Sequence, residues 1–136
     1  MAKVTVIGEF NASADQTWQV IGGFNALPAW HPDVQRSELN EGKNVRTLTL
    51  VDGGTVIEKL ELQSEESREY RYSLVRSSLP VSDYQSTLKV SPRGEGSQVE
   101  WTGEFEPSGV SADEAVALIH GIYQAGLDNL KQILHH

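Results

Sequence analysis

The feature that most constrains this chain is a long amphipathic segment that follows residue 110. Apolar residues recur in it at every third or fourth position, which predicts a helix with one apolar face. The segment opens on Ser111-Ala112-Asp113-Glu114, a capping box that marks a first helical turn. The apolar positions are Ala115, Leu118, Ile119, Ile122, Tyr123, Leu127, Leu130 and Leu134. A helix of about six turns cannot bury this face alone, so another layer must cover it.

Segments earlier in the chain predict that covering layer. Alternating or apolar stretches are separated by turn residues, which predicts consecutive strands near residues 34–40, 45–51, 55–64, 69–77, 83–91 and 97–106. Residues 3–10 also alternate and predict the first strand. Antiparallel strands need one face covered and the long helix needs the same, so we expect the two to cover each other in an α+β fold.

Two shorter segments lie between the first two predicted strands. Ser13-Ala14-Asp15-Gln16 is a second capping box, and it predicts a short helix that ends near Phe24 because Gly22-Gly23 lowers helix propensity. Residues 25–32 hold prolines on both sides of Trp30-His31, which predicts a loop or a broken helical turn.

The composition predicts one soluble domain that spans residues 1–136. The chain carries 11 Lys plus Arg against 19 Asp plus Glu, a net charge of −8, which disfavours nucleic acid as a partner. It has no cysteine, which excludes disulfides, thiolate metal sites and cysteine nucleophiles. We expect no signal peptide and no membrane span, and a cytoplasmic location. The terminal His135-His136 pair is either native or a tag remnant and receives no functional weight.

Several short motifs, together with the order of elements, resemble a known superfamily. They are Ala14 to Trp18, Trp30-His31-Pro32, Gly42 to Leu50 with Asp52-Gly53, Leu79-Pro80-Val81 before Tyr84, and Tyr123 to Leu127. The chain resembles the SRPBCC superfamily, also called START-like or pollen-allergen-like, in its polyketide cyclase/dehydrase branch. The resemblance implies a helix-grip fold, in which a seven-stranded curved antiparallel sheet wraps the C-terminal helix. It also implies an elongated pocket between sheet and helix for an apolar or amphipathic ligand.

The expected hairpin at Asp52-Gly53-Gly54 predicts which side chains face the helix. If these three residues form the loop, with Gly54 in the left-handed conformation, Leu50 lies opposite Val56 and Leu48 lies opposite Glu58. Arg46 and Glu58 then share the apolar face as diagonal neighbours, close enough for an ion pair inside the molecule.

The later strands add polar and aromatic groups to the same inner face. The predicted pairs are Val90 with Val99, Leu88 with Trp101, Ser86 with Gly103 and Tyr84 with Phe105. The inner face then collects Arg46, Glu58, Tyr70, Tyr72, Tyr84, Ser86 and Trp101, opposite Tyr123 and His120 of the helix. This set is too polar for an ordinary core and favours a wet pocket. We expect the small residues Gly103, Gly121 and Gly126 to leave room for it.

These faces and the resemblance together predict a ligand-binding set. Its members are Trp30, His31, Arg46, Leu48, Glu58, Tyr72, Tyr84, Trp101, Ile119 and Tyr123. Structural roles without ligand contact stay open for these residues. Arg46 and Glu58 could form a purely structural ion pair, and His31 could have a capping or surface role. Each tyrosine could be a core residue whose hydroxyl reaches the surface. No metal site and no cofactor are expected, because the motifs that hold them are absent from the sequence.

Three functions compete at this stage. The first is a carrier or sensor of a hydrophobic small molecule, with Arg46 fixing an acid or carbonyl oxygen. The second is a cofactor-independent cyclase or dehydratase in which Arg46 polarises a carbonyl and Glu58 or His31 moves a proton, although pairing with Arg46 should make Glu58 a weaker base. The third is a co-chaperone-like interaction module with an exposed apolar patch. Whether the chain forms a homodimer is open.

Overall fold

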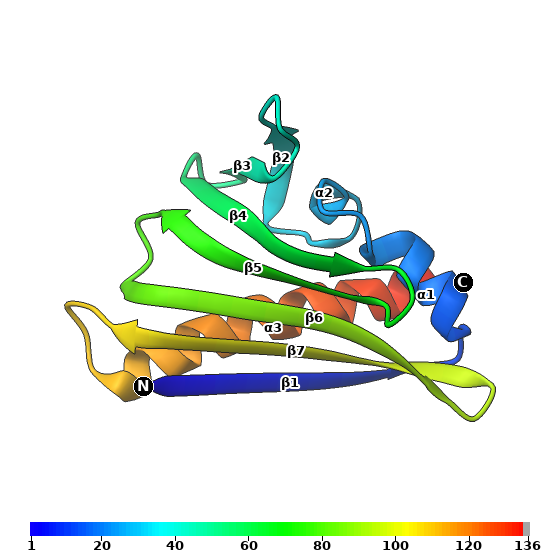
Figure 1. The fold of residues 1–136 in the computed structure, drawn as a ribbon. Coiled ribbons are helices and arrows are strands. Elements are labelled where there is room, and N and C mark those ends of the chain that lie inside the picture. The colour runs from blue at the N-terminus through cyan, green and yellow to red at the C-terminus, as the bar shows by residue number, and fades with distance from the viewer. Residues whose placement is uncertain (135–136) are drawn as a thin grey trace.

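The computed structural model describes residues 1–134, which form an antiparallel sheet with one long helix on its concave side (Figure 1). The strands are β1 (Ala2–Phe10), β2 (Val34–Leu39), β3 (Val45–Leu50), β4 (Thr55–Ser64), β5 (Glu69–Arg76), β6 (Val81–Arg93) and β7 (Gly96–Pro107). They form one seven-stranded sheet in the order β1-β7-β6-β5-β4-β3-β2. The predicted class, sheet and C-terminal helix are therefore confirmed, while the predicted His135-His136 pair lies outside the described residues.

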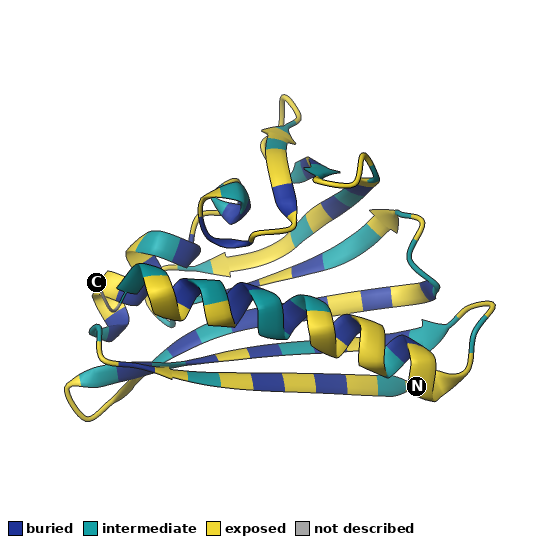
Figure 2. Cartoon of the chain, turned by 180° about the vertical axis from the view of Figure 1, so that it is seen from behind, coloured by how far each residue is buried: buried dark blue, intermediate teal, exposed yellow. Residues whose placement is uncertain are grey.

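The helices are α1 (Ala14–Ile21), α2 (Leu27–Trp30) and α3 (Ala112–Leu134). Helix α3 packs mainly on β1 and β7 and also contacts α2. Seen from behind in Figure 2, its buried positions face the sheet, and the strands below it alternate between buried and exposed residues. No helix within residues 1–134 is both long and apolar enough to cross a membrane.

Local interactions explain where the helices begin and end. The Ser13 hydroxyl accepts from the Gln16 amide at 3.1 Å, and the Gln16 side chain accepts from the Ser13 amide at 3.0 Å, which confirms the capping box. The Ser111 hydroxyl likewise accepts from the Glu114 amide at 3.1 Å. Helix α1 ends at Ile21, earlier than predicted, and the segment with two prolines contains the single helical turn α2.

The register of the β3–β4 hairpin differs from the prediction by two residues. Arg46 lies directly opposite Glu58, and Leu48 lies opposite Val56. The turn therefore sits one residue earlier, and Gly53, with a φ of 91°, takes the left-handed conformation predicted for Gly54. Because side chains alternate with a period of two, a shift of two residues leaves every side chain on the predicted face.

The β6–β7 register is confirmed along most of its length. Val90 pairs with Val99, and the predicted Leu88–Trp101 and Ser86–Gly103 pairs are also present. The predicted pairing of Tyr84 with Phe105 is wrong, because the register shifts between Ser82 and Gln85, where Asp83 has a φ of 51°. Tyr84 still faces inward, and its ring stacks on that of Phe105 with centroids 6.0 Å apart.

Two of the three inward glycines permit close packing instead of leaving room. A Cβ atom at Gly103 would collide with the Tyr123 hydroxyl. A Cβ atom at Gly126 would lie 2.7 Å from His31, 3.0 Å from Trp30 and 3.1 Å from Trp101. Gly121 faces open space. The expectation that these glycines enlarge a pocket is wrong, since helix and sheet have already closed over the first two.

Alanine at Gly126 and at Gly121 should therefore change stability in opposite directions. Both substitutions raise the helix propensity of α3 by up to about 1 kcal/mol. Gly126→Ala should nevertheless destabilise the protein by about 1–3 kcal/mol, because three aromatic rings would have to move. Urea denaturation of both variants measures this difference. Equal stabilisation by the two substitutions would contradict the packing described here.

Candidate ligand-binding site

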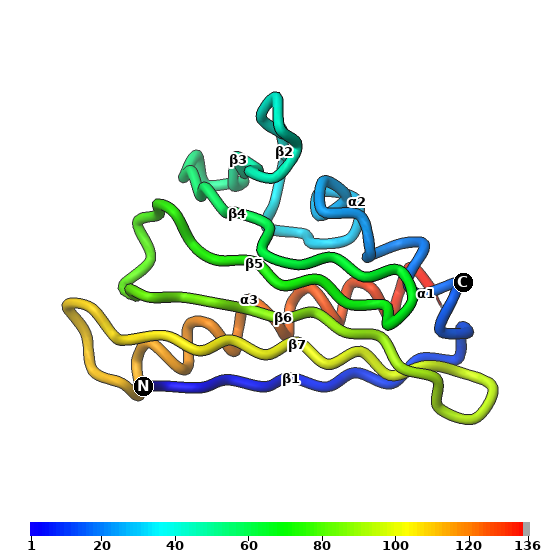
Figure 3. The backbone as a smooth tube through the Cα atoms, in the orientation of Figure 1, coloured from blue at the N-terminus to red at the C-terminus, as the bar shows by residue number. Residues whose placement is uncertain are grey.

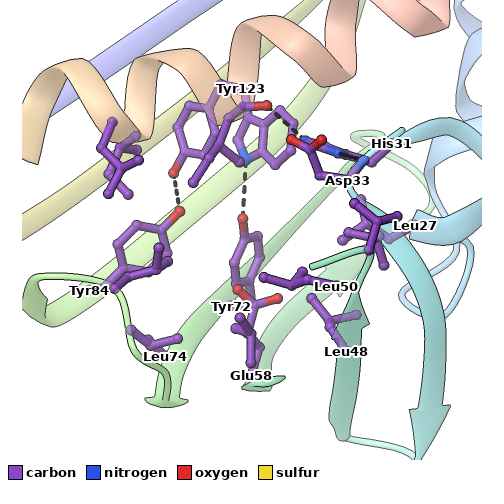
Figure 4. A pocket seen from close by; sticks show the side chains of 18 of the residues that line it. Leu27, His31, Asp33, Leu48, Leu50, Glu58, Tyr72, Leu74, Tyr84 and Tyr123 are labelled. Atoms are coloured by element: carbon purple, nitrogen blue, oxygen red, sulfur yellow. Dashed lines mark hydrogen bonds between the residues drawn. The ribbon is translucent and has the colours of Figure 1, made fainter. Parts of the chain in front are cut away.

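A cavity of about 430 Å³ lies between α3 and the concave face of the sheet (Figure 4). Its walls come from α3, from β3 to β7, and from the segment that joins α2 to β2. The lining residues are Leu27, His31, Asp33, Val34, Leu48, Leu50, Val51, Asp52, Val56, Glu58, Tyr72, Leu74, Leu79, Tyr84, Trp101, Leu118, Ile119, Ile122 and Tyr123. Most are aliphatic or aromatic, so the transfer of an apolar molecule from water into the cavity is favourable.

The structure brings most of the predicted ligand-binding residues to this cavity. His31, Leu48, Glu58, Tyr72, Tyr84, Trp101, Ile119 and Tyr123 all line it. Trp30 and Arg46 do not. Trp30 is fully buried and packs against Trp101, with ring centroids 5.4 Å apart. His120, expected beside the tyrosines, is exposed on the outer face of α3.

Arg46 lies behind the cavity wall, enclosed by its partners. Its Nε donates to Glu58 Oε1 at 2.9 Å, and its Nη1 donates to the Phe24 carbonyl at 2.6 Å. Nη2 lies 2.8 Å from the same Glu58 oxygen, in an ion-pair contact without hydrogen-bond geometry. The guanidinium also lies over the rings of Phe24 and Tyr72, 4.3 Å and 4.8 Å from their centroids. Arg46 therefore holds Glu58 in place and has no exposed surface for a ligand.

Glu58 is the only buried carboxyl among the lining residues, and it forms part of the cavity wall. Burial raises the pKa of Glu58 above its ordinary value, because a desolvated carboxylate is unfavourable, and the nearby Arg46 only partly opposes this effect. Arg46 lowers the pKa of this carboxyl, as expected from the pairing, but the larger effect of burial raises it overall.

Aromatic hydroxyls and one serine form a hydrogen-bonded chain along the inner wall. Trp101 Nε1 donates to Tyr72 at 3.2 Å and to Ser86 at 3.0 Å. The Ser86 hydroxyl donates to the Thr102 carbonyl at 2.9 Å and also contacts the Tyr123 hydroxyl at 2.9 Å. Tyr123 in turn contacts the Tyr84 hydroxyl. Burial raises the pKa of both Tyr72 and Tyr84 well above the ordinary value, so these hydroxyls stay neutral.

His31 uses both ring nitrogens within the protein. Its Nε2 lies 2.7 Å from the Ile122 carbonyl, which can only accept, so Nε2 carries the proton. Its Nδ1 accepts from the Asp33 amide at 3.2 Å. Burial lowers the pKa of His31, which keeps the ring neutral. These bonds tie the segment after α2 to α3 and leave neither nitrogen free for proton transfer.

Comparison with known proteins identifies the family. Residues 1–135 match the family described as "Polyketide cyclase / dehydrase and lipid transport". The chain belongs to this family. The resemblance to its START-like superfamily is thereby confirmed.

The chain is also similar to individual proteins and solved structures. The chain is 44% identical to the protein XoxI from Bacillus cereus, with a TM-score of 0.97 over 99% of this chain and 96% of that one. It is 25% identical to MLP-like protein 423 of Arabidopsis thaliana, over 92% of this chain and 86% of that protein. A START superfamily protein from Mycobacterium smegmatis shares the fold, with a TM-score of 0.82 at 15% identity over 99% of this chain and 98% of that one.

The sequence placed the mouth of the cavity beside the Trp30-His31 loop and did not indicate that the β3–β4 turn also borders it. Val51 and Leu118 line the cavity with exposed fractions of 62% and 39%, so the opening lies between the β3–β4 turn and α3. The tube view in Figure 3 shows that turn and the β5–β6 connection at the same end of the sheet. Asp33 and Asp52 join Val51 at this opening. A turn signal at residues 52–54 was visible, but it did not indicate proximity to the helix.

Removing Arg46 should expose the cost of a buried, unpaired carboxylate. We expect Arg46→Met to destabilise the protein by about 3–5 kcal/mol at neutral pH. The pKa of Glu58 already exceeds 4.5 in the folded state and would rise further without Arg46. A group with a raised folded pKa contributes stability at low pH and loses it as pH rises, so the destabilisation should be smaller near about pH 5 than near about pH 7.

The double variant Arg46→Met/Glu58→Leu is the matched control. It removes both charges, so it should be more stable than Arg46→Met and lack the additional pH dependence. Urea denaturation at the two pH values measures both effects. A double variant no more stable than the single one would refute the pairing.

Proposed function

We propose that the protein binds a hydrophobic or amphipathic small molecule in the cavity, as a carrier or sensor. The observation that carries this proposal is an open cavity of about 430 Å³ whose wall is mainly apolar. This volume falls within the range of roughly 300–1,000 Å³ that is typical of small-molecule sites. The family description, which includes lipid transport, supports the same class of ligand.

The lining explains the gain in free energy on binding. Leu27, Val34, Leu48, Leu50, Val56, Leu74, Leu79, Ile119 and Ile122 supply aliphatic surface on several sides. Each methylene group that a ligand buries there contributes about 0.8 kcal/mol. The hydroxyls of Tyr72 and Tyr84 give the ligand a small number of oriented polar contacts (Figure 4). Such a site binds by shape and burial and needs no covalent step.

A cyclase or dehydratase is the second candidate. The observation that favours it is Glu58, a carboxyl of raised pKa in the cavity wall, as is typical of a general acid or base. Two features weigh toward binding alone: Glu58 Oε1 is held by Arg46, and both His31 nitrogens are engaged. Recovery of the bound molecule after incubation separates the two functions, because dehydration would lower its mass by one water and cyclisation without water loss would change its chromatographic retention at constant mass.

Filling the cavity should weaken ligand binding without unfolding the protein. Leu74 lines the cavity, whereas Val75, the next residue of β5, is 58% exposed. We expect Leu74→Trp to weaken binding of decanol at least about tenfold by excluding it from the cavity. Val75→Trp adds the same side chain outside and should bind decanol like the unmodified protein. Isothermal titration calorimetry gives the affinities.

Native mass spectrometry of protein purified from its own host complements this titration. We expect a noncovalently bound apolar molecule on the unmodified protein and on Val75→Trp, and its loss from Leu74→Trp. Equal decanol affinity in the two tryptophan variants, or no measurable binding to the unmodified protein, would reject the proposed function.

A further inference from the structure

The ionisable side chains that line the cavity are acidic. Asp33, Asp52 and Glu58 line it, and no Lys or Arg of the described chain does. Arg46 is the nearest candidate cation, but it is fully buried and bound to Glu58 and Phe24. His31 is neutral, as its hydrogen bonds show. Arg46 compensates the charge of Glu58, so the uncompensated charges that a ligand meets are those of Asp33 and Asp52.

Two of these carboxylates stand together at the mouth. The Val51 amide donates to the Asp33 carbonyl at 3.0 Å, which brings Asp33 beside the turn that carries Asp52. Both side chains are exposed, and neither forms an ion pair with a Lys or Arg in residues 1–134. A carboxylate arriving here would meet two like charges, whereas an ammonium group would be attracted.

The hydrogen-bonded chain deeper in the cavity has a direction. The single proton of the Ser86 hydroxyl goes to the Thr102 carbonyl, so Tyr123 must donate to Ser86. Tyr123 has then used its proton, so Tyr84 must donate to Tyr123. The Tyr84 oxygen lines the cavity and can only accept from a ligand. The interior thus offers a ligand an acceptor at the Tyr84 oxygen.

We propose that the cavity selects an amphipathic amine and discriminates against carboxylates, with the apolar part of the ligand buried and its N–H donors directed to Tyr84 or to the mouth carboxylates. This inference rests on the proposed function and names its ligand class. This proposal replaces the expectation that Arg46 fixes an acidic ligand. The Arg46 guanidinium is already bound to Glu58 and to the Phe24 carbonyl behind the cavity wall.

Three probes with the same ten-carbon chain test the inference: decylamine, decanol and decanoate, titrated by calorimetry at neutral pH and low salt. We expect decanoate to bind at least about tenfold more weakly than decylamine. Equal or tighter binding of decanoate would overturn the inference, while binding of decanol would still support the proposed function. Failure of all three probes to bind would overturn both.

Charge removal at the mouth shows whether the selectivity is local. Asp33→Asn/Asp52→Asn keeps the size of both side chains and should reduce the decylamine preference several-fold. The control Glu100→Gln/Glu104→Gln removes two charges from exposed positions on β7 and should leave the preference unchanged. Equal reductions in both variants would mean that net charge alone attracts the amine. The assignment of the selectivity to Asp33 and Asp52 would then be rejected.

Tyr84→Phe tests the interior acceptor. Loss of one hydrogen bond should weaken decylamine binding by about threefold to tenfold and leave the weak decanoate binding unchanged. Tyr70→Phe is the control, because Tyr70 is buried but does not line the cavity. If Tyr84→Phe weakened both probes equally, its effect would be a general loss of packing and the acceptor role would be rejected.

Discussion

The architecture depends on how closely α3 can approach the sheet. At one end of the sheet the approach is tight, because Gly126 lets the helix backbone meet Trp30, His31 and Trp101, and Gly103 makes space for Tyr123. Helix α3 packs mainly on β1 and β7. The more distant strands β3 to β5 curve past the helix, and the space between them is the cavity (Figures 1 and 4). The tightly packed residues His31, Trp101 and Tyr123 therefore form one wall of the cavity, and the strands farther from the helix form the opposite wall.

The polar groups in this interior follow from the same geometry. A buried charge is tolerated only when it is paired, and Arg46 is paired so completely that it presents nothing to the cavity. The tyrosine and serine hydroxyls satisfy one another in sequence and end on a backbone carbonyl. The polar groups that remain available to a ligand are therefore an acceptor oxygen on Tyr84 and the carboxylates of Asp33 and Asp52. These groups define the polar chemistry that a ligand meets.

Much of the inner face could be predicted because a register error of two residues leaves every side chain on the same face of the sheet. The β3–β4 hairpin is offset by two residues from the prediction, yet Arg46, Leu48 and Glu58 still point inward. The alternation of side chains could not show how deeply each inward side chain is buried behind the cavity wall. Arg46 and Tyr72 share a face, but one lies behind the wall and the other forms it. Asp33 and Asp52 escaped prediction because a loop residue has no alternating pattern that indicates its direction.

The sequence by itself determined the order of strands and helices, the capping of α1, the amphipathic face of α3 and the side of the sheet that it covers. These properties depend on local periodicity and on neighbouring strands, which short stretches of sequence encode. Only the tertiary structure decided how far Arg46 is withdrawn, which hydroxyl donates to which, and where the cavity opens. Those outcomes depend on distances between segments far apart in the chain, set when α3, the β3–β4 turn and the segment after α2 pack together.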